Sequence, residues 1–191
     1  MLDKLAAWFN LDFNKMKKIA IIGNACSGKT QLSRELAKRY NLPLTHVDSI
    51  QFLAGMNLRD PNETRKILEN RANQDQWIID GFGPLKIIED RFQKSDVVIF
   101  IRLPLWRNYW WCCRRQIIGF FSRKQREELP AGCNEFTIQQ TVKLFKTIWN
   151  VYFGMWLQLD RIFLQEIYKN KIIYIRTLAD LNKMYKTGIL D

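Results

Sequence analysis

Gly23-Asn24-Ala25-Cys26-Ser27-Gly28-Lys29-Thr30 fills every fixed position of the phosphate-binding loop pattern G-x-x-x-x-G-K-[ST]. In such a loop, successive backbone N–H groups form an anion-binding nest, and the helix that follows directs the positive end of its dipole at the same point. The eight residues are therefore expected to bind the phosphates of a nucleoside triphosphate.

The residues around the loop have the order that this motif requires. Residues 18–22 form a β-branched run typical of a buried parallel strand, and residues 31–40 have the spacing of a helix. A chance match on a surface turn would not have both neighbours. By the mechanics of the motif, Gly28 allows close backbone approach, Lys29 reaches the β- and γ-phosphates, and the Thr30 hydroxyl ligates Mg²⁺.

Short apolar runs alternate with helical patterns along the rest of the chain, which predicts a parallel sheet with helices on both faces. Further strands are expected at residues 44–48, 77–80, 96–102 and 171–176. Helices are expected at residues 63–73, 85–92, 103–118, 135–168 and 178–186. Asn62 is the expected N-cap of the first of these helices, and Gly154 marks an expected break in the fourth. Ligands of such folds bind at the carboxyl ends of the strands.

Asp48, Asp80 and Arg102 each end a predicted strand beside the loop. Asp80 follows the apolar run 77–79, as in a Walker B strand, and is expected to orient Mg²⁺ or its waters; capping of the next turn is the alternative. Asp48 either organises an acceptor hydroxyl or the metal shell, or begins a turn. His46 is expected to be a strand residue with a locally satisfied ring rather than a general base.

Residues 119 to about 133 are the most polar and punctuated stretch, which predicts a mobile basic lid. Phosphoryl transfer requires neutralisation of charge, so arginines that close over the phosphates are expected. Arg114 and Arg115 directly precede the lid and are the preferred candidates; Arg107, Arg123 and Arg126 are also available. The aromatic residues between 106 and 111 are expected to pack in the core, with base stacking as the alternative.

The 191 residues carry 30 Lys and Arg against 19 Asp and Glu, a net charge of +11. This charge favours polyanionic partners: nucleotides, nucleic acid or an anionic membrane surface. The basic residues are scattered, so general basicity without a specific partner stays open. The four cysteines form no C-x-x-C pair and the single histidine is distant from them, which argues against a zinc site and for a reducing, cytoplasmic location.

The first 15 residues are expected to form an amphipathic extension to a P-loop kinase-like domain at 16–191. Leu2, Leu5, Phe9 and Phe13 recur at helical spacing, which predicts a helix docked on the domain or, alternatively, on a membrane surface. A signal peptide is not expected, and no segment has the roughly 18 to 20 uninterrupted apolar residues of a membrane span.

The chain resembles the adenylate kinase-related P-loop kinases, and among them the DNA topology modulation (FlaR-like) proteins. The similarity spans residues 17–184 and rests on Ile19-Ala20-Ile21-Ile22-Gly23, Ser27-Gly28-Lys29-Thr30, Trp77-Ile78-Ile79-Asp80-Gly81-Phe82, Asp96-Val97-Val98-Ile99-Phe100 and Leu103-Pro104. It implies a three-layer α/β/α P-loop NTPase fold with a five-stranded parallel sheet, ATP with Mg²⁺, and phosphoryl transfer to a small acceptor such as a nucleoside monophosphate.

Carried over residue by residue, the resemblance assigns Gly23, Gly28, Lys29 and Thr30 to the triphosphate and Asp80 to the metal region. It assigns Arg114 and Arg115 to the lid and Arg59 and Arg91 to the acceptor phosphate. The sequence departs from adenylate kinases at Gly83-Pro84, where Pro-Arg usually follows Asp-Gly-Phe, so an acceptor-site arginine is missing. Cys26 also stands where relatives commonly have glycine.

Three hypotheses follow from the sequence. The first is an ATP-dependent kinase for a small acceptor. The second is a nucleotide-regulated DNA-binding protein, suggested by the net charge and the aromatic-basic segment near residue 110. The third is an ATPase switch that needs no acceptor.

Overall fold

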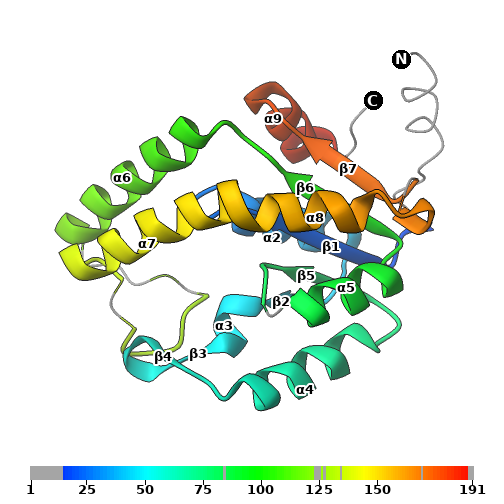
Figure 1. The fold of residues 1–191 in the computed structure, drawn as a ribbon, viewed down its shortest axis with the longest axis horizontal. Coiled ribbons are helices and arrows are strands. Elements are labelled where there is room, and N and C mark those ends of the chain that lie inside the picture. Colours follow the sequence, from blue (N-terminus) through cyan, green and yellow to red (C-terminus); the bar gives the residue numbers. More distant parts are fainter. Residues whose placement is uncertain are drawn as a thin grey trace.

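A five-stranded parallel sheet, in the order β2-β5-β1-β6-β7, forms the centre of the protein (Figure 1). The computed structural model describes residues 15–83, 85–122, 126, 128–133, 135–168 and 170–188. The strands of this sheet are β1 Lys18–Gly23, β2 Leu44–His46, β5 Trp77–Asp80, β6 Val97–Ile101 and β7 Ile172–Ile175. All four pairings are parallel, which confirms the expected three-layer α/β/α fold.

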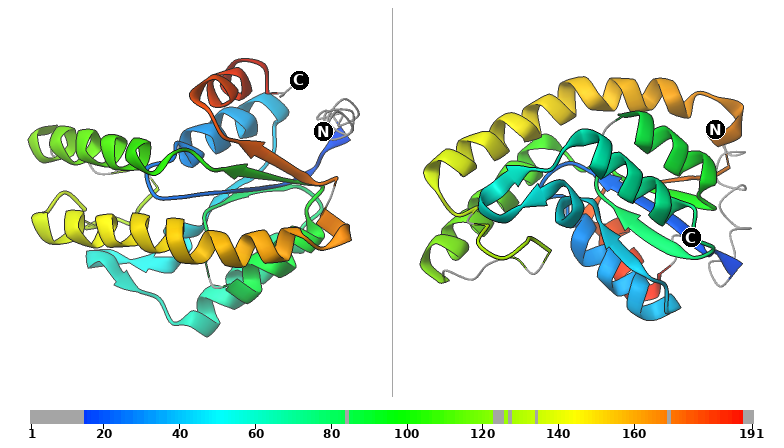
Figure 2. Two further views of the ribbon diagram at one scale, coloured as in Figure 1. Left: turned by 45° about the horizontal axis from the view of Figure 1, so that its top comes forward. Right: turned by 90° about the horizontal axis from the view of Figure 1, so that it is seen from below.

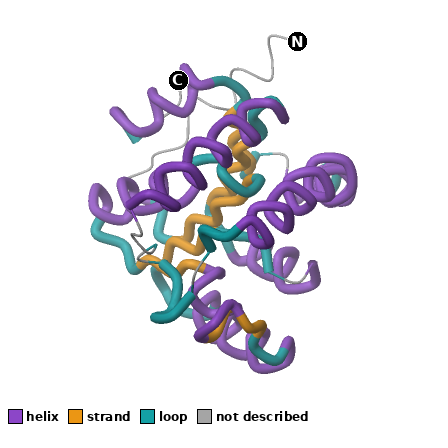
Figure 3. The backbone as a smooth tube through the Cα atoms, turned by 90° about the vertical axis from the view of Figure 1, so that its left-hand side faces the viewer, coloured by secondary structure: helices purple, strands orange, loops and turns teal. Residues whose placement is uncertain are grey.

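Helices cover both faces of the sheet (Figures 2 and 3). One face packs against α2 Lys29–Tyr40 and α9 Leu178–Thr187, and the other against α4 Pro61–Ala72, α5 Leu85–Lys94 and α8 Trp156–Phe163. Side chains of β1 alternate between the two cores: Ile19 and Ile21 join the first, Ala20 and Ile22 the second, and all four are fully buried. This central position explains why β1 is apolar throughout rather than at every second residue.

Two long helices extend from the sheet as an antiparallel hairpin (Figures 1 and 2). They are α6 Leu105–Ser122 and α7 Ile138–Asn150; α7 continues through a π-helical turn, η4 Val151–Met155, into α8. Gly154 therefore widens the helix where a break was expected. The lid was expected to begin at Gly119, but α6 runs on to Ser122, because the missing side chain of Gly119 admits the ring of Phe136 against the helix.

The segment after β2 differs most from the expectation. The strand ends at His46, so Asp48 lies in the short helix α3 Val47–Gln51 and does not end a strand. A small hairpin follows where a loop was expected, formed by β3 Phe52–Leu53, the turn η3 Ala54–Met56 and β4 Asn57–Leu58. The N-cap of α4 is Asp60 rather than Asn62, because the Asp60 carboxylate accepts the N–H groups of Asn62 and Glu63.

The edge strand β7 is preceded by the turn η5 Glu166–Tyr168. Arg102 follows β6 as expected, but it pairs with Asp160 of α8 at 2.7 Å and stacks on Trp156, and it does not line the phosphate loop. Within the described residues, no helix is both long and apolar enough to cross a bilayer. The expected amphipathic extension lies outside the described residues except for Lys15.

Candidate active site

The turn between β1 and α2 has the backbone of an anion-binding nest. Cys26 and Gly28 both adopt left-handed conformations, with φ of 56° and 88°. Residues of this kind curve a loop so that successive N–H groups converge on one point. A Cβ atom on Gly23 would lie 2.7 Å from Ser27 Oγ and 3.0 Å from Ile101, so only glycine fits where the strand enters the loop.

The α6–α7 hairpin holds this loop from the side. Asn24 is buried, and its Nδ2 donates to the carbonyl of Ile148 in α7 over 2.8 Å. Asn108 of α6 donates to the carbonyl of Ala25 over 3.0 Å. The side chain of Asn24 thus faces the hairpin, so only its backbone can take part in the predicted phosphate binding.

A cleft of about 560 Å³ opens over the loop. Its charged side chains come from the loop, from α2, α3 and α6, and from the connection between α6 and α7, which is the stretch expected to form the lid. They comprise Lys29, Arg34, Glu35, Asp48, Arg115, Arg126 and Glu128. The backbone of residues 25–31 forms its floor. Lys29 Nζ lies 3.4 Å from the carbonyl of Asn24 and therefore points across the loop. A ligand in this cleft would contact positive side chains and the backbone N–H groups of the loop, an arrangement that fits a polyphosphate.

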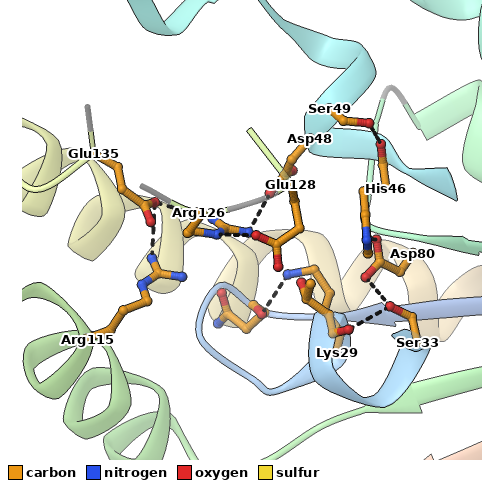
Figure 4. A network of polar contacts seen from close by, with 12 residues as sticks. Lys29, Ser33, His46, Asp48, Ser49, Asp80, Arg115, Arg126, Glu128 and Glu135 are labelled. Atoms are coloured by element: carbon orange, nitrogen blue, oxygen red, sulfur yellow. Dashed lines mark hydrogen bonds and ion pairs between the residues drawn. The ribbon is translucent and has the colours of Figure 1, made fainter. Parts of the chain in front are cut away.

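Asp80 lies at the end of β5, beside the first turn of α2 (Figure 4). It is 3% exposed; its Oδ1 lies 2.8 Å from His46 Nδ1, and its Oδ2 accepts from Ser33 Oγ over 2.8 Å. Burial raises the pKa of Asp80, but the hydrogen bond and charge of His46, the charge of Lys29 and the Ser33 hydroxyl outweigh it and leave the pKa below its usual value. The carboxylate is therefore ionised. The ring of His46 is satisfied locally, as expected.

Ser33 connects Asp80 with the residue expected to ligate magnesium. Its Oγ lies 2.9 Å from the carbonyl of Thr30 as well as 2.8 Å from Asp80. An ionised carboxylate at a strand end and a threonine hydroxyl at the start of the helix after the loop are the donors with which P-loop proteins hold Mg²⁺, the remaining positions being filled by waters and phosphate oxygens. The residues present thus fit the metal.

Arg126 of the lid forms the centre of an ionic network (Figure 4). Its guanidinium lies 3.3 Å from Glu135, 3.3 Å from Glu128 and 3.6 Å from Asp48. Burial lowers the pKa of Arg126, but these three carboxylates outweigh that effect and raise it above its ordinary value. Arg126 therefore keeps its charge, and it links the lid to the helix α3 that carries Asp48.

Two further arginines extend this network to the helices around the loop. Arg34 of α2 pairs with Glu128 at 3.1 Å, and Arg115 of α6 lies 3.6 Å from Glu135. Within the described residues, Nε and Nη2 of Arg115 are buried without a hydrogen-bond partner. Burying such donors is costly unless a ligand or water satisfies them. Arg115 is thus a cation with unused donors at the edge of the cleft.

A second cavity, of about 630 Å³, lies between α6 and α9 on the other side of Gly28. The flat ring of Trp111 and the side chain of Ile118 line it from α6, and Leu181 and Tyr185 line it from α9. The Tyr185 hydroxyl donates to the carbonyl of Gly28 over 3.0 Å, which fixes the cavity beside the loop.

The predicted arginines are not all brought into the cleft. Arg115 lines both cavities, and Arg114 lines only the second. Arg59 donates to the carbonyl of Ile50 and pairs with Glu63, so it stabilises the start of α4 and lines neither cavity.

Arg91 is a correction to the expected acceptor site. It is 1% exposed and donates to the carbonyls of Gly81 and Phe82, because the apolar face of α5 carries it into the core behind β5. Burial lowers its pKa to about 10. Arg91 therefore holds the turn after the Walker B strand and does not reach the cleft.

The sequence offered little signal for several residues of the network. Arg34 follows Thr30 by one helical turn, and this spacing could have indicated that it faces the loop. Arg126 was one of several available arginines, Glu128 lies in the polar stretch expected to be a lid, and Glu135 stands at the first residue of an expected helix. Arg123 lies outside the described residues.

No protein-family model matches the chain, and a search of curated proteins finds no match. Among solved structures, it is similar to a shikimate kinase from Acinetobacter baumannii in complex with shikimate, at a TM-score of 0.49 and 14% identity, covering 94% of this chain and 98% of that one. A gluconokinase from Sinorhizobium meliloti 1021 matches with a TM-score of 0.49 and 10% identity, over 91% of this chain and 89% of that one. At such values these likenesses carry no argument about substrate or residue roles, and they do not show the resemblance to FlaR-like proteins.

Proposed function

We propose that the protein is an ATP-dependent phosphotransferase that transfers the γ-phosphoryl group to a small acceptor with a free hydroxyl. The observation that carries the proposal is that one cleft contains the phosphate loop, the cations Lys29, Arg115 and Arg126, and the carboxylate of Asp48. An ATP-binding switch would use the same loop, and its carboxylate would orient water instead of an acceptor hydroxyl.

The two cavities fit the two halves of a nucleotide. The triphosphate lies on the backbone N–H groups of the loop, and the base occupies the second cavity against Trp111 and Tyr185. Thr30 and Asp80 would hold magnesium, which would neutralise charge on the phosphates. The ionised state of Asp80 supports this role.

Phosphoryl transfer depends on alignment and on neutralisation of charge that spreads over the transferred group. Lys29 supplies a compact positive charge from the loop, and Arg115 supplies unused donors from α6. Arg126 closes from the lid. Asp48 aligns the acceptor hydroxyl and accepts its proton, once the acceptor has taken the place of Arg126 beside it.

The acceptor class follows from which side chains reach the cleft. Arg59 and Arg91 do not line it. The proposal therefore favours an acceptor held through a hydroxyl over one held through a phosphate. The resemblance to adenylate kinase-related proteins makes nucleoside monophosphates the alternative acceptors.

Isothermal titration calorimetry with Mg·ATP tests the first step. Lys29→Ala is expected to abolish measurable binding, whereas Lys38→Ala, at the exposed end of the same helix, should bind as the wild type does. Full binding by Lys29→Ala would contradict the proposed use of the loop.

ADP release in the presence of sugars, polyols, cyclic hydroxy acids and nucleoside monophosphates tests the second step. A true acceptor should raise turnover at least about tenfold, and Asp48→Asn should remove that stimulation while leaving Mg·ATP binding intact. Turnover that no acceptor changes, together with normal ATP binding, would instead establish an ATPase switch.

A further inference from the structure

The α6–α7 hairpin presents a row of large apolar side chains to solvent. We call the following eight residues, each between 48% and 84% exposed, the outer stripe: Trp106, Trp110, Ile117, Phe121, Ile138, Val142, Trp149 and Phe153. Isolated exposed apolar residues are ordinary, but a contiguous row of this size marks a surface that binds something.

Each half of the stripe lies on one face of its helix. The steps between its members are four, seven and four residues in α6, and the same four, seven and four residues from α7 into η4. Steps of this length return to the same side of an α-helix.

The packing of the hairpin places both halves on the same side. The helices meet through Tyr109 with Phe145, at 5.1 Å between ring centroids, and through Gln116 with Thr141, at 3.1 Å. Three stripe residues, Trp110, Ile117 and Val142, each follow one of these contact residues directly in the sequence. One residue along an α-helix corresponds to a rotation of about 100° around its axis. Because the helices are antiparallel, the same rotation in both brings the two halves together on one side.

Residues that precede the contact positions face the opposite way. Arg115 of α6 and Leu144 of α7 each lie one residue before a contact residue, and both line the cleft over the phosphate loop. The outer stripe is therefore on the far side of the hairpin from the cleft. A surface that covers the stripe leaves the cleft open.

The charge of the hairpin restricts what can cover it. Neither α6 nor α7 contains an Asp or a Glu. Of their basic residues, Arg114 and Arg115 line the cavities, whereas Arg107, Lys143 and Lys146 do not. Arg107 lies over the ring of Trp106, 4.1 Å from its centroid. Surfaces that enter the headgroup region of an anionic bilayer combine tryptophan and phenylalanine with lysine and arginine and lack acidic residues, and the two helices have this composition.

We propose that the outer stripe docks this protein on the surface of an anionic lipid bilayer. A second copy fits less well, because two chains of net charge +11 would meet through helices that lack acidic residues. Nucleic acid also fits less well, since Ile117, Ile138 and Val142 have no ring on which a base could stack. The proposal does not depend on the proposed phosphotransfer.

Flotation of the full chain with lipid vesicles tests the proposal. Vesicles of phosphatidylcholine with 30% phosphatidylglycerol should bind the protein with a blue shift of its tryptophan fluorescence, and vesicles of phosphatidylcholine alone should bind it at least about tenfold more weakly. Binding to the anionic vesicles should weaken in 0.5 M salt.

Two variants and one control separate the stripe from general basicity. Trp110→Ser with Phe121→Ser should lower the affinity for anionic vesicles at least about tenfold, because two large apolar side chains no longer enter the lipid. Lys143→Glu with Lys146→Glu should remove the preference for anionic lipid. Leu58→Ser changes a side chain of similar exposure, 65%, outside the α6–α7 hairpin, and should bind as the wild type does.

Far-UV circular dichroism and Mg·ATP binding should be unchanged in all three variants, since none of these residues lines the cleft or belongs to a core. Equal vesicle binding by the wild type and both hairpin variants would overturn the proposal, as would no vesicle binding by the wild type. Sedimentation showing a dimer that Trp110→Ser with Phe121→Ser dissociates, or oligonucleotide binding through the stripe without vesicle binding, would also overturn it.

Discussion

Replacing Gly119 with alanine is a sharp test of the hairpin geometry. Gly119 is buried in the interior of α6, and a Cβ atom there would lie 2.1 Å from Cε1 and 2.2 Å from Cδ1 of Phe136. Phe136 lies just before α7 and next to Glu135, which contacts both Arg115 and Arg126. The substitution therefore acts on the hairpin and on the ionic network together.

Two opposing effects determine the result. In an exposed helix interior, alanine is better than glycine by about 1 kcal/mol. Here the Phe136 ring would have to move by roughly 1.4 Å to restore an ordinary carbon–carbon contact of about 3.5 Å. Overpacking of this kind costs about 1–3 kcal/mol, so we expect a net loss of up to about 2 kcal/mol.

Gly154→Ala is the matched control, because Gly154 also lies within a helical segment but its added Cβ would meet nothing within 4 Å. Urea denaturation should show Gly154→Ala as stable as the wild type or more stable by up to about 1 kcal/mol. Gly119→Ala should be less stable than the wild type. In thermal denaturation, its midpoint temperature should be lower by about 2–4 °C for each kcal/mol of lost stability. If Gly119→Ala matched the control, the close contact between α6 and Phe136 would be refuted.

Three further predictions concern the cleft. The pKa of Asp80 is lowered in the folded protein, so its charge stabilises the fold above the unfolded pKa of about 4, and this contribution is lost as pH falls through the folded pKa. Asp80→Asn should therefore lower the free energy of unfolding by about 1–3 kcal/mol at pH 7 and flatten the fall of that free energy below pH 5. An unchanged pH slope would contradict this prediction. The pKa of Cys26 is lowered to about 7, chiefly because Cys112 donates a hydrogen bond to it. The rate of Cys26 alkylation by iodoacetamide should therefore rise up to that pH and then level off, and Mg·ATP should lower this rate. Equal rates with and without nucleotide would show that the ligand does not cover the loop. Arg126→Ala removes one of the cations beside the buried Glu135 and should lower the free energy of unfolding by about 1–3 kcal/mol. Glu135→Gln in the same background should recover part of this loss. Strictly additive losses in a double-mutant cycle measured by urea denaturation would show that the pair is not coupled.

The sequence by itself determined the centre of the fold and the floor of the cleft. Both depend on contiguous residues: a strand that is buried on two faces must be apolar throughout, as β1 is, and a phosphate nest is formed by the backbone of residues 23–30. The five strands and the helices between them were predicted from the same local patterns, with errors of a few residues at their ends. Local patterns suffice there because neighbouring residues supply most of the structure.

Only the tertiary structure decided which charged side chains meet at the cleft. Asp48 reaches it from a helix rather than a strand end, Arg91 turns into the core, and Arg126 joins Glu135 of its own connection to Asp48 of α3. The position of a charged side chain changes by several ångströms when its helix begins one or two residues earlier or when the side chain moves to the next position along the helix. The partners that join different elements, such as Asp48 with Arg126 and Glu128 with Arg34, lie tens of residues apart in the chain, so no local spacing in the sequence records these pairings.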